Sequence, residues 1–212
     1  MNETAKREAI CRVGASLFDR GLTHGATGNL SLRLDDGWLM TPTGSNLGSL
    51  DPSRLSRLDA AGRHVAGDPP TKEATLHLAV YDERPASNAV VHLHSTHSVA
   101  VSVLDEVDAA DVLPPLTAYY VMRVGTLPLV PFYRPGDPAL AAAIRDYAGG
   151  HHAMLLANHG PVVAGSSLAA AVDATEELEE TARLFLMLHG RRLRPLTPAQ
   201  VAEVRAAFPV KG

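Results

Sequence analysis

The chain has 212 residues, 46% of them hydrophobic and 20% charged, with a formal net charge of −4 at pH 7. This is the composition of an ordinary globular protein, and it offers no basic cluster for nucleic acid. No apolar run approaches the ~20 residues that a membrane span needs. The charged start MNETAKREAI lacks the apolar core of a signal peptide, and Cys11 is the only cysteine, so we expect a cytoplasmic protein without disulfides.

Hydrophobic spacing and turn residues predict the elements of the first half. In chain order they are a helix over 3–20 ended by Gly21, a hairpin of strands over 29–34 and 38–43, a weaker hairpin around 60–62, and a helix that follows Pro69-Pro70 with Thr71 as its cap.

The second half alternates strands and helices. Strands are predicted over 89–94, near 127–130, over 152–160 and over 161–165, and helices over 95–104, 137–148, 166–190 and 197–208. The prolines between 112 and 130 interrupt any regular pattern there. We expect one α/β domain over 1–212, with a mixed sheet covered by helices on both sides.

Three histidines interrupt the apolar stretch VVHLHSTHSVAV at 90–101. On a strand, His92 and His94 point to the same side with Cα atoms about 6.6 Å apart, a spacing that lets two imidazoles converge on one ion. The alternative is two core histidines, each bonded to a carbonyl group. A metal site therefore requires further ligands.

Two residues elsewhere in the chain are candidate ligands. His159, in Asn158-His159-Gly160, follows an apolar strand, where α/β sheets place functional groups, although a histidine in a turn is the plain alternative. Glu73 lies in the predicted first turn of a helix, where a carboxylate also complements the helix dipole. Three imidazoles and one carboxylate form a ligand set that suits Zn²⁺ or a similar divalent ion.

Two other sequence patterns bear on this site. His77 follows Glu73 by four residues and so shares its helix face, but we expect it to pack against the sheet. A cupin barrel also uses His-x-His, with a glutamate four or five residues further on. Ser98 and Val99 hold those positions here, which argues against a cupin.

Several turns are rich in glycine, threonine, serine and asparagine. THGATGNLS (23–31) and TPTGSN (41–46) bracket one hairpin, and PPTKE (69–73) adds Thr71 and Lys72 at a helix N-terminus. Backbone N–H groups and hydroxyls in such turns bind phosphate, as do helix N-termini. Turns are also rich in these residues for conformational reasons, so each segment alone is a weak signal.

In this order, these motifs resemble the class II aldolase/adducin family, over about residues 5 to 190. The resemblance implies a single-domain α/β/α sandwich with a central, largely antiparallel sheet, assembled as a homotetramer. It implies one Zn²⁺ per subunit, with Mn²⁺ or Co²⁺ as alternatives, bound by Glu73, His92, His94 and His159. It places a phosphate pocket at Asn29, Thr43, Gly44, Thr71 and Lys72.

The resemblance also implies catalytic roles. Fuculose-phosphate aldolase takes its proton donor from a tyrosine of an adjacent subunit, which Tyr119 matches best, with Tyr120 as its immediate neighbour. Glu73 is expected to serve as ligand, as acid or base, or as both.

The subgroup is indicated by Thr71-Lys72-Glu73, where fuculose-type aldolases tend to have Ser-Ser-Glu and ribulose-phosphate epimerases have aspartate in place of Glu73. The motifs most resemble the members that convert 3-oxo-tetronate 4-phosphate into dihydroxyacetone phosphate and CO₂ through a metal-stabilised enediolate, in four-carbon sugar-acid catabolism. A fuculose-phosphate type aldolase is the alternative, and an adducin-like scaffold, which lacks the ligands, a distant one. We expect the partner to be a phosphorylated four-carbon keto acid, with neither nucleic acid nor membrane.

Overall fold

The computed structural model describes residues 2–209, and one eight-stranded sheet runs through this range. Its order is β4-β3-β2-β1-β5-β8-β7-β6. The strands are β1 (Asn29–Leu34), β2 (Gly37–Met40), β3 (Ser56–Asp59), β4 (His64–Ala66), β5 (Ala89–His92), β6 (Leu129–Val130), β7 (Ala153–Leu156) and β8 (Gly160–Gly165). Neighbouring strands pair antiparallel except β6 and β7, which confirms the predicted sheet.

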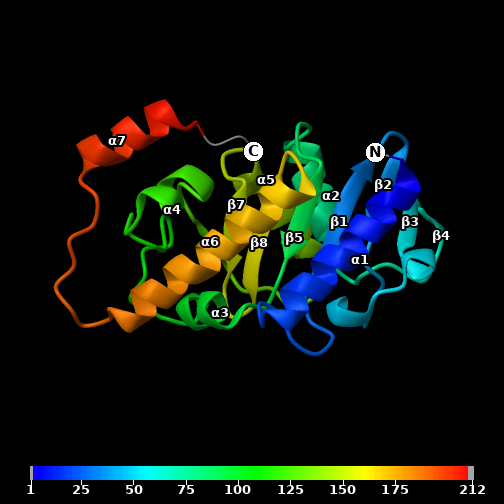
Figure 1. Cartoon of the computed structure of the whole chain (residues 1–212), viewed down its shortest axis with the longest axis horizontal. Helices are drawn as coiled ribbons and strands as arrows, with labels where there is room; N and C mark the ends of the chain where they lie inside the picture. Colours follow the sequence, from blue (N-terminus) through cyan, green and yellow to red (C-terminus); the bar gives the residue numbers. More distant parts are fainter. Residues whose placement is uncertain (1, 210–212) are drawn as a thin grey trace.

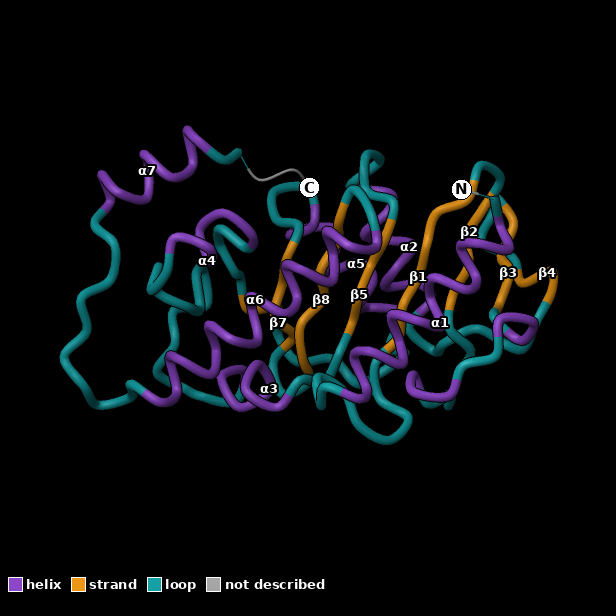
Figure 2. Tube along the Cα trace, viewed as in Figure 1, coloured by secondary structure: helices purple, strands orange, loops and turns teal. Residues whose placement is uncertain are grey.

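Helices cover both faces of the sheet (Figure 1). They are α1 (Glu3–Asp19), α2 (Ala74–Glu83), α3 (Thr96–Ser102), α4 (Ala118–Arg123), α5 (Pro138–Ala148), α6 (Leu168–Met187) and α7 (Pro198–Ala207). The tube in Figure 2 shows α1 and α6 in front of the strands and α2 and α5 behind them. The predicted α/β/α sandwich is confirmed. None of the helices in the described range is long and apolar enough to span a bilayer.

Strand β5 lies in the middle of the sandwich, with both faces buried. Val90 belongs to the core cluster built by α2 and α5, whereas Val91 belongs to the cluster built by α1 and β1. A strand buried on both faces reads as a continuous apolar run, so a polar residue at its end stands out. That residue is His92.

Among the predicted boundaries that were wrong, two concern the candidate site. Helix α2 begins at Ala74, with Glu73 at the N-cap position and no capping bond from its side chain. Thr71 therefore does not cap the helix; its hydroxyl accepts the Glu73 N–H at 3.2 Å and shapes the turn before it. Strand β5 ends at His92, so His94 lies beyond the strand on which it was predicted.

The short helix α4 was missing from the predicted elements. Its six residues follow Pro114 and Pro115, and the Thr117 side chain caps it by accepting the Tyr120 N–H at 3.0 Å. Prolines obscure the hydrophobic period in this region, and a helix of under two turns depends on tertiary packing. Tyr120 supplies that packing, since it is fully buried in the core cluster formed with α3 and α6.

Candidate metal centre and adjoining cavity

Four side chains from three separate parts of the fold converge beside the end of β5. Glu73, His92, His94 and His159 each offer one ligand atom, and these atoms all lie within 4.8 Å of one another. The Nε2 atoms of His92 and His94 are 3.1 Å apart. The Glu73 carboxylate approaches Nε2 of His92 and Nε2 of His159, at 3.3 Å each. The structure thus brings together all four predicted ligands, although β5 itself holds only one of them.

A tight turn between β7 and β8 places His159. Asn158 has φ of 56°, a left-handed conformation that residues other than glycine rarely adopt, and Gly160 has φ of 151°. A Cβ atom on Gly160 would lie 2.2 Å from the Leu93 carbonyl oxygen, so only glycine fits there. Strained conformations of this kind occur where surrounding structure holds a functional group in place.

The hydrogen bonding of His92 determines which of its ring nitrogens faces the cluster. Its Nδ1–H donates to the Pro161 carbonyl oxygen at 2.9 Å, which leaves the lone pair on Nε2. That lone pair points at the other three side chains. A backbone carbonyl that orients an imidazole in this way is a common support for metal-binding histidines.

The charge state of the cluster suits a divalent cation. Burial raises the pKa of the Glu73 carboxyl group, but the His92 imidazole and the Asn29 N–H outweigh this, and the pKa falls to about 2. Burial and neighbouring imidazoles lower the pKa of His94 to about 3 and that of His159 to about 4. At neutral pH the cluster therefore offers the imidazole lone pairs of His94 and His159 and the Glu73 carboxylate. In the described chain, Oε1 of Glu73 is buried without a hydrogen-bond partner, which also fits a cation ligand.

A cavity of about 250 Å³ adjoins the cluster. Its lining includes Glu73, His94 and His159, together with the five residues predicted to bind phosphate, which are Asn29, Thr43, Gly44, Thr71 and Lys72. The amide of Asn29 is already engaged, because Nδ2 donates to Glu73 at 2.8 Å and Oδ1 contacts His77. One Nδ2 hydrogen is left for a ligand. Phosphate binding by the five residues remains a prediction.

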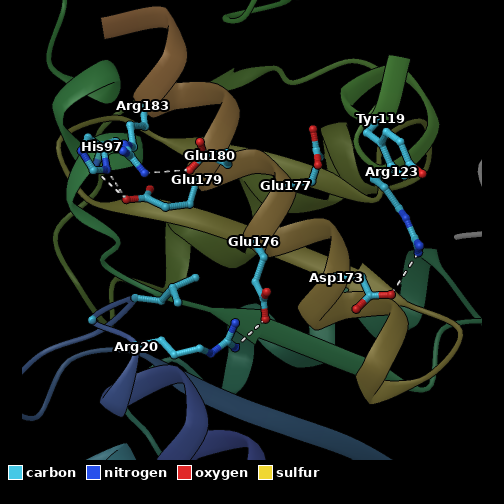
Figure 3. A pocket seen from close by; sticks show the side chains of 12 residues that line it. Arg20, His97, Tyr119, Arg123, Asp173, Glu176, Glu177, Glu179, Glu180 and Arg183 are labelled. Carbon is cyan, nitrogen blue, oxygen red and sulfur yellow. Dashed lines mark hydrogen bonds and ion pairs between the residues drawn. The ribbon is translucent and has the colours of Figure 1, made fainter. Parts of the chain in front are cut away.

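The two tyrosines of α4 lie elsewhere. Tyr119 is 61% exposed and lines a different cavity of about 550 Å³, with Arg123 and Asp173 nearby (Figure 3). Tyr120 is fully buried, and its hydroxyl has no hydrogen-bond partner within residues 2–209. Neither tyrosine is among the described residues that line the cavity beside Glu73. A proton donor from α4 would therefore have to come from another subunit.

Three imidazoles and one ionised carboxylate, at the end of a central strand of a mixed sheet in an α/β/α sandwich, define an α/β protein with the donor set of a divalent-metal site. The chain belongs to the class II aldolase and adducin family, whose N-terminal domain matches residues 8–186. The predicted family is thus confirmed.

Individual relatives cover nearly the whole chain. It is 51% identical over 205 residues to the protein named 3-oxo-tetronate 4-phosphate decarboxylase from Escherichia coli strain K12, which covers 96% of this chain and 97% of the relative. It is 32% identical over 217 residues to the L-fuculose phosphate aldolase of Haemophilus influenzae, covering 100% of this chain and 97% of the relative. The crystal structure of YgbL from Escherichia coli superposes with a TM-score of 0.94 at 50% identity, covering 96% of this chain and 99% of that one.

Proposed function

We propose that this protein is a metal-dependent decarboxylase that converts 3-oxo-tetronate 4-phosphate into dihydroxyacetone phosphate and CO₂. The observation that carries the proposal is the single cavity in which Glu73, His94 and His159 lie beside Thr71 and Lys72. One molecule with a phosphate at one end and a keto acid at the other matches that layout. The name of the relative at 51% identity supports the same substrate class, and the aldolase relative is more distant at 32%.

Different residues around the cavity would bind the phosphate and the metal ion. Lys72, Thr71, Thr43, Gly44 and Asn29 bind the phosphate and so hold the keto acid against the cluster. Glu73, His92, His94 and His159 would hold a divalent ion, which we propose to be Zn²⁺, and this ion would supply Lewis-acid stabilisation of the negative charge that develops on the C3 oxygen. Burial of the cluster keeps water away from this charge.

The carbon that loses CO₂ needs a proton. We propose Tyr119 of an adjacent subunit as its donor, with Glu73 as the alternative acid or base. Tyr119 is exposed and lines a different cavity from the one beside Glu73, which supports a donor that acts across a subunit boundary. A donor of this kind requires an oligomer; from the family resemblance we propose a homotetramer, and from the composition we propose a cytoplasmic location.

A sugar-phosphate aldolase is the second candidate, because an aldolase relative aligns with the whole chain. It would use the same ligands and phosphate pocket but would expel an aldehyde in place of CO₂. Incubation with 3-oxo-tetronate 4-phosphate, followed by analysis of CO₂, dihydroxyacetone phosphate and aldehyde, separates the two activities.

Lys72→Met is expected to raise KM for the phosphorylated substrate by about 10- to 100-fold, because it removes one charge-assisted contact with the phosphate. Steady-state kinetics measures this, and elemental analysis should show unchanged metal content. Lys72→Arg keeps the charge and should recover most of the affinity. If KM is the same in Lys72→Met as in the wild type, Lys72 does not bind the phosphate.

Tyr119→Phe is expected to slow turnover by about 10²- to 10⁴-fold, the usual contribution of a general acid. Tyr120→Phe is the matched control and should keep near wild-type turnover, because its buried hydroxyl has no partner in the described chain. Mixed oligomers of Tyr119→Phe and His92→Ala chains should regain activity, since some sites then combine an intact cluster with an intact tyrosine. Full activity of Tyr119→Phe would exclude this donor.

A further inference from the structure

A line of buried polar side chains leads from the core to Glu73. Tyr81 Oη lies 2.9 Å from Ser31 Oγ, which lies 2.7 Å from His77 Nδ1. His77 Nε2 contacts Asn29 Oδ1, and Asn29 Nδ2 donates to Glu73 Oε2 at 2.8 Å. All five residues are buried. His77 was expected only to pack against the sheet; it forms the middle of this line.

The line forms because the two-residue repeat of β1 and the four-residue repeat of α2 have nearly the same length in space. Asn29 and Ser31 are two residues apart on β1 and so share one face, about 6.6 Å apart. Glu73 at the N-cap of α2, and His77 and Tyr81 within the helix, follow one another at four-residue intervals, a rise of about 6 Å per helical interval. The helix residues therefore alternate in space with the strand residues, and each polar group meets the next.

The direction of every hydrogen bond follows from the carboxylate at the end. An ionised carboxylate only accepts, so Asn29 must turn its NH₂ group toward Glu73 and its oxygen toward His77. His77 must then carry its hydrogen on Nε2 and its lone pair on Nδ1. Ser31 must donate to that lone pair, which leaves its oxygen to accept the hydroxyl hydrogen of Tyr81.

We propose that His77 is a positioning residue for the metal centre, because its Nε2–H holds the Asn29 amide in the one orientation that binds Glu73 Oε2. With Oε2 engaged by Asn29, Oε1 is the carboxylate oxygen left for the ion. Without His77, the amide is free to turn, and the carboxylate loses the donor that fixes its plane. This inference rests on the proposed metal site.

The tautomer of His77 tests the direction of the bonds and needs no metal. Nitrogen-15 NMR of the ¹⁵N-histidine-labelled wild-type protein separates a protonated ring nitrogen from one that carries a lone pair. We expect hydrogen on Nε2 and a lone pair on Nδ1. A His77 that carries hydrogen on Nδ1, or exchanges between the two tautomers, overturns the proposal.

Metal affinity tests the consequence. In Zn²⁺ titrations against a competing chromophoric chelator, His77→Leu should bind about 10- to 100-fold more weakly, the usual effect of losing a residue that supports a ligand. His77→Gln places an amide N–H where Nε2–H was, and should stay close to wild type. His152→Leu is the matched control. That histidine is also buried, and among the described residues its side chain bonds only the Arg123 carbonyl oxygen, so metal affinity should not change.

The outcomes separate this proposal from the proposed function. Wild-type affinity in His77→Leu, or equal losses in His77→Leu and His77→Gln, shows that the hydrogen bond does not position Glu73 and overturns the inference. A wild-type protein that binds no Zn²⁺ contradicts the proposed function, whereas the tautomer measurement still decides the arrangement of the line. If His77→Leu does not fold, the proposal is tested by the Zn²⁺ affinity of His77→Gln and by the His77 tautomer of the wild-type protein.

Discussion

Replacing His92 or His94 with alanine is expected to remove the bound divalent metal and abolish turnover. Each substitution leaves three side chains of the cluster, and a site of this kind holds its ion poorly when a protein ligand is lost. His92→Ala also removes the ring that fills the fully buried space between Glu73 and Pro161. Elemental analysis of the purified variants and a turnover assay measure both effects.

The control for these variants is His64→Ala. His64 lies exposed on β4 at the far edge of the sheet, where its ring contacts only the Ala66 carbonyl oxygen among the described residues. This variant should keep wild-type metal content and turnover. Full metal occupancy together with normal turnover in both His92→Ala and His94→Ala would rule out the proposed site, whatever the sequence relatives do.

Most helices and strands of the fold can be predicted from local sequence patterns. The alternation in 29–34 and the Asp35-Asp36-Gly37 turn predict the first hairpin, because strand and turn geometry are set within a few residues. The long apolar stripe of 166–190 likewise predicts α6. Helix α4 could not be predicted in this way, since its stability comes from burying Tyr120 against α3 and α6 and not from its own sequence.

The candidate site was more predictable than the details that support it. The prediction placed His92 and His94 on one strand and expected their rings to converge. The rings do converge, but β5 ends at His92, so His94 reaches the cluster from the segment after the strand. The role of His77 was missed because its partner Ser31 lies 46 residues away along the chain. A signal was nevertheless present in the sequence: polar residues occupy positions 29 and 31 on one face of a strand whose other face is leucine, and polar residues recur at four-residue intervals from Glu73 into α2.

The second prediction concerns the products that the protein forms from its substrate. Offered 3-oxo-tetronate 4-phosphate, the protein is expected to release CO₂ and form dihydroxyacetone phosphate, with no aldehyde as a second product. A β-keto carboxylate supplies a group that departs as neutral CO₂, so the cluster needs only to stabilise charge on the C3 oxygen and no base has to deprotonate the departing group. Coupled assays for CO₂ and dihydroxyacetone phosphate measure the two products.

Two further measurements on the same reaction identify its chemistry. In D₂O, one deuterium should appear at the carbon that lost CO₂, because that carbon takes its proton from Tyr119, Glu73 or water. Chelator should stop the reaction, and added Zn²⁺ should restore it, since charge on the C3 oxygen is otherwise unstabilised in a buried site. Cleavage of fuculose-type phosphates to an aldehyde, with the keto acid left intact, would replace the decarboxylase with the aldolase. The four-residue cluster would keep its role in either case, because both reactions leave the same negative charge beside it.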